Sequence, residues 1–349
     1  MGRETAIEAW KVWRKRVDFE LDVDGGSLRL LPLAYINIKN LGVEDDILNR
    51  LKGIYRRAWS ENQRIIYECR NVLKLFKDAG IETMVLKGIP LTIRVYENYA
   101  IRPMADMDIL VPYANATEAV DLLRKQKFIV ENENRLNHNL RYGRSIGFSD
   151  EKKDIEVDLH WRAISQAKEL SMDHLHWKNA IPLKFNGLQT KSLCPTDELL
   201  LTIAHGMRRN PEPPIRWVAD AIMIIRKEHS KIDWDQLLDL SIQYREFLKV
   251  KKAFQYLEKV FDVRVPNLFT EQVKRLQPTF AEKVIYNHEA TIGINKKNMT
   301  FMERVYSFYA RFLRQSGRLN FFKLHIDLMR YTGSRIKKKI TEPNTSGLS

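Results

Sequence analysis

Two carboxylates separated by one residue are the first feature of this sequence that could do chemistry. Asp106 and Asp108 flank Met107 in the run Asp-Met-Asp-Ile-Leu-Val, whose apolar residues predict a buried strand over 106–111. Because side chains alternate along a strand, both carboxylates point to one face, about 7 Å apart along it. Oxygen ligands in this arrangement suit one or two Mg²⁺ ions. Standing alone, such a pair is also typical of a solvent-exposed strand edge.

A second acidic strand is predicted over 154–161, where the sequence reads Asp-Ile-Glu-Val-Asp-Leu-His-Trp. Alternation places Glu156, Asp158 and His160 on one face and the apolar residues between them on the other. If this strand lies beside the first one, it brings Asp158 to Asp106 and Asp108. Glu156 and His160 then either support the site or simply face water.

A lysine and a glycine stand between a predicted strand over 83–86 and a predicted helix over 90–97. Gly88 would let the backbone approach a phosphate, and the N-terminus of the helix favours an anion. Lys87 would add a positive charge beside it. A plain turn between strand and helix explains the same residues equally well.

Together these residues resemble the polymerase-beta-like nucleotidyltransferase superfamily. The nearest resemblance is to a little-characterised bacterial family with the pattern K-G, then R-x-x-x-D-x-D, then D-L-H-W. Here the first element is Lys87-Gly88, the second runs from Arg102 to Asp108, and the third is Asp158-Leu-His-Trp. The resemblance covers roughly residues 25 to 265. Ala105 stands where many members of the broader superfamily carry a serine.

The resemblance implies transfer of a nucleoside monophosphate from a nucleoside triphosphate to an acceptor, with pyrophosphate leaving. It implies that Asp106 and Asp108 hold an Mg²⁺ or Mn²⁺ ion that bridges the triphosphate, and that they share a second ion with Asp158. Lys87 and Arg102 would then neutralise phosphate charge, while Gly88 would give the phosphates room.

The acceptor is left open by the sequence, which is compatible with a protein, an RNA, a small molecule or a peptide. A second function class also stays open: a non-catalytic protein of the same fold that binds nucleotide or RNA through its basic C-terminal part. Three retained carboxylates favour the enzyme, because a protein that only binds has no need of three metal ligands.

Apolar spacing along the chain predicts the elements that would position these residues. We expect an α+β fold with an N-terminal helical region over 1–80 and a nucleotidyltransferase domain over 81–195. That domain would hold a small mixed sheet with helices on one face. A helical domain over 196–340 follows, with a helix over 197–207 capped by Thr196, and a polar, disordered tail ends the chain over 341–349.

Composition points to a globular protein with anionic partners. The chain carries two cysteines, which favours a reducing, cytoplasmic setting, and it has no apolar run long enough for a transmembrane segment. Its net charge is +14. Twelve basic and two acidic residues fall in 296–339, so most of the excess lies outside the predicted catalytic region, and this block is expected to bind an anionic partner.

Further candidates lie in the C-terminal half. His205 would either reach the active site or pack in the core. Arg208, Arg209 and Arg216 surround a proline-rich loop and would either bind phosphate or acceptor or remain solvated. Aromatic residues interleave with basic ones after residue 300, which fits ordinary helix packing better than binding of nucleic acid or lipid head groups.

Overall fold

A computed structural model describes residues 2–164, 170–208, 215–261 and 263–292, together with 300, 303, 306, 307, 309, 310 and 313. The chain forms two compact units, Met1–Gln277 and Pro278–Ser349. All the residues singled out for catalysis lie in the first unit. The domain borders expected near residues 80, 195 and 340 stay predictions.

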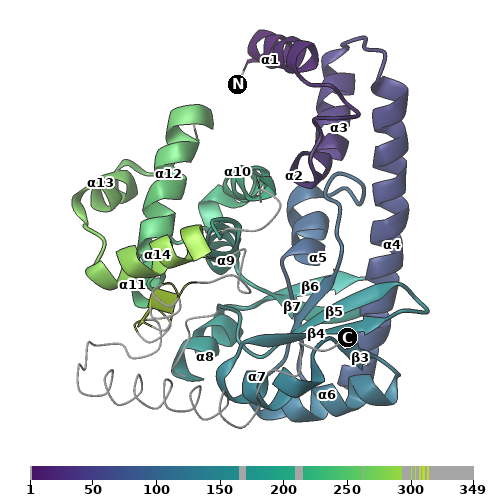
Figure 1. Ribbon diagram of the computed structural model, residues 1–349, viewed down its shortest axis with the longest axis vertical. Coiled ribbons are helices and arrows are strands. Elements are labelled where there is room, and N and C mark those ends of the chain that lie inside the picture. Colours follow the sequence, from purple (N-terminus) through teal and green to yellow (C-terminus); the bar gives the residue numbers. More distant parts are fainter. Residues whose placement is uncertain are drawn as a thin grey trace, which may run out of the picture. The chain divides into compact units, whose positions relative to one another are not determined.

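The N-terminal region is helical. Helices α1 (Arg3–Arg16), α2 (Gly25–Leu28) and α3 (Leu31–Leu41) precede the long helix α4 (Leu48–Asp78). Leu31, Tyr35, Ile38 and Leu51 form a small core of their own between α3 and α4. The second half of α4 turns its apolar residues toward the sheet, so this one helix joins two hydrophobic cores (Figure 1).

One mixed sheet of seven strands occupies the centre of the first unit. The strand order is β3-β4-β5-β2-β1-β7-β6. The strands are β1 (Met84–Leu86), β2 (Met107–Leu110), β3 (Ile129–Val130), β4 (Ser145–Asp150), β5 (Ile155–His160), β6 (Ile181–Phe185) and β7 (Leu188–Ser192). β2 pairs in parallel with β5, and β1 with β7, while the other neighbours are antiparallel. The predicted α+β class with a mixed sheet is confirmed.

The β6–β7 hairpin was not expected, although its turn carries a clear signal. Asn186 and Gly187 connect the two strands with φ values of 47° and 74°. A two-residue turn with positive φ at both positions is the form that asparagine followed by glycine favours. The hairpin extends the sheet beyond β1, on the side away from β2.

Helices cover the sheet on both faces, whereas the sequence predicted helices on one face only. Val85, Met107, Ile109 and Val157 pack with apolar residues of α4 and of α6 (Ala116–Lys125) on one face. On the other face, Met84, Leu86 and Leu110 belong to the core formed by the C-terminal helices. The expected helix after Lys87 is present as α5 (Gly88–Pro90) and a π-helical turn (Leu91–Tyr96). A short helix α7 (Leu136–Tyr142) precedes β4.

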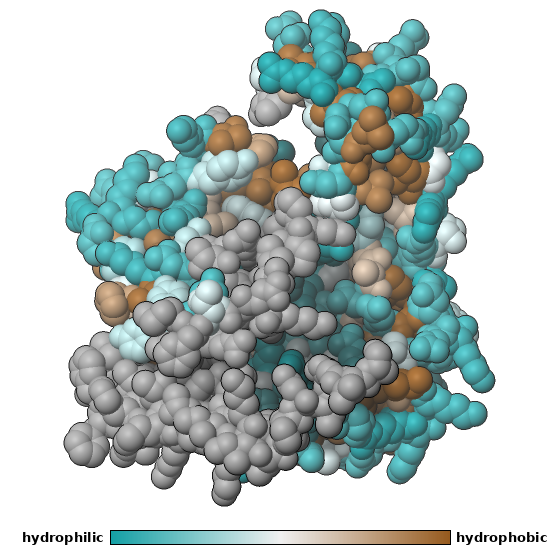
Figure 2. Space-filling model, in the orientation of Figure 1, coloured by the Kyte–Doolittle hydropathy of each residue, from teal (hydrophilic) through white to brown (hydrophobic). Residues whose placement is uncertain are grey.

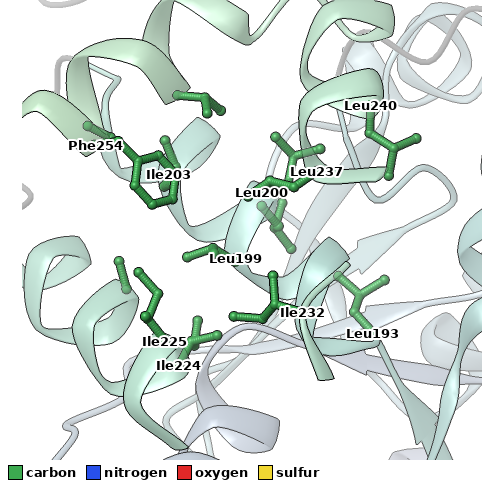
Figure 3. Packing of buried hydrophobic residues seen from close by; sticks show 14 of the residues in the cluster. Leu193, Leu199, Leu200, Ile203, Ile224, Ile225, Ile232, Leu237, Leu240 and Phe254 are labelled. Atoms are coloured by element: carbon green, nitrogen blue, oxygen red, sulfur yellow. The ribbon is translucent and has the colours of Figure 1, made fainter. Parts of the chain in front are cut away.

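The C-terminal helices of the first unit form the larger core (Figure 3). They are α8 (Leu170–Asn179), α9 (Pro195–Gly206), α10 (Arg216–Glu228), α11 (Trp234–Gln243), α12 (Phe247–Phe261) and α13 (Asn267–Arg275). The predicted cap at Thr196 is wrong, because α9 begins at Pro195, two residues earlier than expected, with Cys194 as the capping residue. The Thr196 hydroxyl instead accepts a hydrogen bond from the Asp233 backbone nitrogen at 2.8 Å, which ties α9 to the start of α11.

The second unit contains α14 (Phe280–Ile292), against which Ala310 and Leu313 pack. The tail expected over 341–349 lies outside the described residues, as does most of the basic block at 296–339. Throughout the described part of the chain, no helix combines the length and the apolar character needed to cross a bilayer. The expected cytoplasmic location stays a prediction.

Candidate active site

The parallel pairing of β2 with β5 brings two of the predicted carboxylates side by side. Asp108 and Asp158 are direct partners across the two strands, and Leu110 is the partner of His160. The alternating apolar residues Met107, Ile109, Val157 and Leu159 all enter the core on the opposite face, which fixes the side on which the carboxylates stand. Asp108 is buried, whereas the Asp158 side chain remains 25% exposed.

His160 lies between these two carboxylates. Its Nε2 atom is 2.9 Å from Asp108 Oδ1 and 2.9 Å from Asp158 Oδ2, and the side chain is fully buried. Burial acts to lower the pKa of His160, but the charge of Asp158 and the hydrogen bonds to both carboxylates outweigh it and raise the pKa. One ligand atom from each of Asp108, Asp158 and His160 lies within 4.8 Å of the others, so the three could hold a metal ion.

Asp106 stands just before β2 and is not part of this group of three. Burial, followed by the charge of Asp108, raises the pKa of Asp106 to about 6. The charge of Asp158 also contributes to this shift, which places Asp106 in the electrostatic field of both partners. Asp106 lines one cavity together with Asp108 and another together with Asp158.

Lys87 and Gly88 lie beside the carboxylates at the N-terminal end of α5. The Lys87 Nζ atom donates a hydrogen bond to Asp108 Oδ1 in an ion pair that is largely buried. Burial acts to raise the pKa of Asp108, but the Lys87 charge and the His160 hydrogen bond keep it below its ordinary value. A Cβ atom added to Gly88 would lie 2.8 Å from Met104 Sδ, so any larger residue at this position would require the Met104 side chain to shift. Lys87 itself has φ +54°, a strained conformation for a residue other than glycine.

Arg102 is buried and makes a two-pronged ion pair with Asp220 on α10. Its Nε and Nη2 atoms each lie 2.9 Å from an Asp220 oxygen, and the Tyr96 hydroxyl donates to the same carboxylate at 2.8 Å. The guanidinium thus joins the segment before β2 to the C-terminal helices. Arg216 strengthens this junction by donating from Nη1 to the Pro103 carbonyl at 2.7 Å.

Asn62 of α4 holds the same segment from the other side. Its side-chain nitrogen donates to the carbonyls of Tyr99 and Arg102, and its side-chain oxygen accepts from the Met104 backbone nitrogen at 2.9 Å. Asn62 is fully buried. A buried amide with these three bonds fixes the path of the chain that leads to Asp106.

Two cavities meet at Asp106. The first has a volume of ≈ 250 Å³ and is lined by four cationic side chains, Arg29, Lys87, Arg102 and Arg216, and by three carboxylates, Asp106, Asp108 and the Arg102 partner Asp220. Its far wall consists of residues from α9 and α10, among them Thr202, His205 and Trp217. Burial lowers the pKa of His205 well below its ordinary value, and the charges of Lys87 and Arg208 add to the effect, so this imidazole is neutral.

The second cavity has a volume of ≈ 470 Å³ and opposite charge. Its wall contains Asp106 and Asp158 together with Glu131 and Glu156, and Arg135 is its one cationic lining residue among those described. Burial, followed by the charges of Asp158 and Glu156, raises the pKa of Glu131. Asp106 thus separates a cationic cavity from an acidic one.

Comparison with known proteins gives the fold and site a family. A family model described as an uncharacterised nucleotidyltransferase matches residues 27–262. The chain belongs to this family. The match includes both aspartate-bearing strands, Lys87-Gly88 and the helices through α12. The predicted membership in the nucleotidyltransferase superfamily is therefore confirmed, and the protein is a nucleotidyltransferase.

The other comparisons add little to this assignment. A tRNA nucleotidyltransferase, solved in complex with a primer tRNA and an incoming ATP analogue, matches with 13% identity and a TM-score of 0.23. The match covers 78% of this chain and 87% of that one. No curated protein matches the chain.

Some residues that build the site of this nucleotidyltransferase were not foreseen from the sequence. Asn62 is the main example, although a polar residue on the buried face of α4, next to Ala58 and Ile65, is a signal that could have revealed it. The role of Arg208 stays a prediction, and Arg209 lies outside the described residues, as do residues 210–214. Glu156, which was expected either to support the site or to face water, is exposed and lines the acidic cavity.

Proposed function

We propose that this nucleotidyltransferase moves a nucleoside monophosphate from a nucleoside triphosphate to an acceptor in a metal-dependent reaction. The observation that carries the proposal is the direct pairing of Asp108 with Asp158 beside a cavity lined by cations. In the reaction, an acceptor oxygen bonds to the α-phosphorus, the bond from that phosphorus to the bridging oxygen breaks, and pyrophosphate leaves.

The chemistry of the donor set fits a divalent ion. The carboxylates of Asp106, Asp108 and Asp158 offer the oxygen ligands that Mg²⁺ and Mn²⁺ prefer. His160 Nε2 hydrogen-bonds to two of these carboxylates and would orient them, or would itself serve as a nitrogen ligand. When bound, such an ion supplies charge for the phosphates and lowers the pKa of the attacking hydroxyl.

The cationic cavity is the proposed site of the triphosphate. Lys87 and Arg216 are placed on its wall to neutralise phosphate oxygens, and the absence of a side chain at Gly88 gives the phosphates a close approach to the backbone. Arg102 is already paired with Asp220. We assign it two roles: it adds positive charge near the cavity, and it holds the segment before Asp106 in place.

The acidic cavity is the proposed side of entry for the acceptor. It meets the cationic cavity at Asp106, so an acceptor held there would reach the carboxylate centre from the side opposite the triphosphate. The acceptor is a protein, an RNA, a small molecule or a peptide. The basic block at 296–339 stays our prediction for contact with an anionic partner.

Labelled nucleotides test the proposal directly. The full chain is incubated with each of the four triphosphates, labelled at the α-phosphate, with Mg²⁺ or Mn²⁺ and a fractionated cell extract. We expect label on one acceptor class in the presence of metal and none in the presence of EDTA. Triphosphate binding that needs no metal, with no label transferred to any fraction, would favour a non-catalytic binding protein of the same fold.

A further inference from the structure

Helix α4 carries a row of basic and aromatic side chains beside the apolar face that it turns to the core, and one of them, Arg70, also donates from Nε to the Asn186 carbonyl at 2.9 Å. We define the α4 stripe as Lys52, Arg56, Trp59, Tyr67, Arg70 and Lys74, with Gln63 in the middle of the row. The spacings between successive members are three or four residues, which puts all of them on one side of the helix. By the helical rise, the row extends over roughly 33 Å.

The two aromatic residues of the α4 stripe are unusually exposed for their size. Trp59 is 51% exposed and Tyr67 is 57% exposed, although both sit in a helix whose other large apolar residues are buried or half-buried. Cations flank this pair on both sides. An exposed ring between cations is the arrangement with which proteins stack nucleic acid bases while holding the backbone.

The charge of the stripe is not cancelled by the acidic residues of α4. No member of the row is a carboxylate. Glu61 pairs with Arg57 and Glu68 with Lys153, both off the row, and only Lys74 of the stripe has a carboxylate partner on the helix, Asp78. Lys52 and Arg56 form no ion pair with any described residue.

The chemistry of the stripe distinguishes between anionic partners. Membrane-surface helices turn an aliphatic face to the lipid, but the aliphatic residues of α4 face the protein core and none of its exposed residues is aliphatic. The edge of the molecule along which α4 lies is largely hydrophilic (Figure 2). A duplex hides the faces of its bases, whereas a single strand offers both phosphates and open rings.

We propose that the α4 stripe binds single-stranded nucleic acid, with the backbone along the cations and bases stacked on Trp59 and Tyr67. This surface is separate from the carboxylate centre, because α4 supplies none of the residues that line the two cavities at Asp106. The proposal therefore stands whether or not nucleotidyl transfer is found.

Anisotropy of a fluorescent oligonucleotide of about 12 nucleotides, added to the full chain, tests the stacking. Trp59→Ala with Tyr67→Ala should weaken binding of the single strand by at least about tenfold. Trp59→Phe with Tyr67→Phe keeps both rings and should restore most of the affinity. Equal binding by the alanine variant and the unchanged chain, both with normal melting, would overturn the proposal.

The cations are tested through the dependence of binding on salt. Lys52→Gln with Arg56→Gln should reduce the slope of log K against log salt by about 1.4, since two phosphate contacts are lost. Lys11→Gln with Lys15→Gln is the matched control, because these lysines are also exposed and four residues apart, but lie on α1. An equal loss of slope in the control would overturn the assignment to α4.

Competitors identify the partner class. We expect single-stranded RNA or DNA to displace the probe better than a duplex of equal charge, and much better than heparin or vesicles of anionic lipid. RNA and DNA versions of one sequence then show whether the 2′-hydroxyl contributes. Displacement by heparin as effective as by the single strand, or preferential capture by vesicles, would overturn the proposal.

Discussion

The two cavities that share Asp106 differ in charge while lying next to each other. The first presents Lys87, Arg102 and Arg216, and the second presents Glu131 and Glu156 beside Asp158. In the proposed reaction, the cationic side would suit the triphosphate, and the acidic side would suit a neutral or cationic group of the acceptor, such as a hydroxyl.

The largest effect is expected at the centre that joins the cavities. Asp108→Asn keeps the shape of the side chain but removes the charge that would hold the metal, so transfer should fall by about a thousandfold. Calorimetry with triphosphate, with and without Mg²⁺, should show that the metal-dependent part of binding disappears. Metal-dependent binding of unchanged strength in this variant would contradict the proposed centre.

The next effect concerns a buried carboxyl group behind the cationic cavity. Glu198 is 2% exposed, and neither of its oxygens has a hydrogen-bond partner among the described residues. Burial raises its pKa to about 8 from an ordinary value of 4.5, against the charges of Arg94 and Arg102. Glu198 is therefore protonated near pH 7 and leaves the charge of Arg102 in place.

Glu198→Gln should reveal this protonation as a pH-dependent gain in stability. Because the folded-state pKa lies above the unfolded one, the wild type loses stability as pH rises from about 5 to about 8, and the loss then levels off. The glutamine variant avoids that loss, on the order of a few kcal/mol. Chemical unfolding at several pH values measures the difference. A constant difference across the window would mean that Glu198 is ionised in the folded protein.

Arg216 tests the cationic side alone. Burial, followed by the charge of Arg102, lowers the pKa of Arg216 to about 10, so the group stays charged at neutral pH. Arg216→Gln should raise KM for the triphosphate about tenfold, and Arg216→Lys less, because lysine keeps the charge but loses the planar fork. KM for the acceptor should be unaffected. An equal rise in KM for the triphosphate and for the acceptor would show that Arg216 supports the structure of the site and does not contact the triphosphate.

The smallest effect is expected on the acidic side. Glu131 is exposed on the wall of the second cavity, so Glu131→Gln should change KM for the acceptor only a few-fold and leave triphosphate binding as it is. Glu151→Gln, at an exposed site outside the lining residues, is the control. Weaker triphosphate binding in the Glu131 variant would show that the nucleotide lies in the acidic cavity, against the proposal.

The sequence predicted the parts of the site that depend on local alternation. The faces of the two acidic strands follow from side-chain periodicity, and so did the expectation that Asp108 and Asp158 would meet. The segment before Asp106 could not be predicted in this way. Its position depends on Asn62 and Asp220, which lie about forty residues before and more than a hundred residues after it. Such contacts are fixed by packing and leave no regular spacing in the chain.

Other misses have different causes. The Asn186-Gly187 turn is a local signal for a hairpin, and it accounts for the two strands at one edge of the sheet that the apolar pattern does not predict. Thr196 has the chemistry of a helix cap but binds the next helix instead, since Pro195 can start α9 without a free backbone donor. The Asn-Gly pair is thus sufficient to predict the hairpin from the sequence. At Thr196, a tertiary contact competes with the local preference for a helix cap.

Because β2 and β5 turn apolar side chains to one face and carboxylates to the other, burial of the apolar face also fixes the strand register that brings the two carboxylates together. A slip of one residue would turn one of the two carboxylates toward the core and expose its apolar neighbours to water. Four buried side chains on the opposite face, from Met107 to Leu159, oppose that error. Asp108 and Asp158 therefore meet correctly or not at all, and misfolded molecules should be inactive instead of carrying a distorted centre with altered specificity.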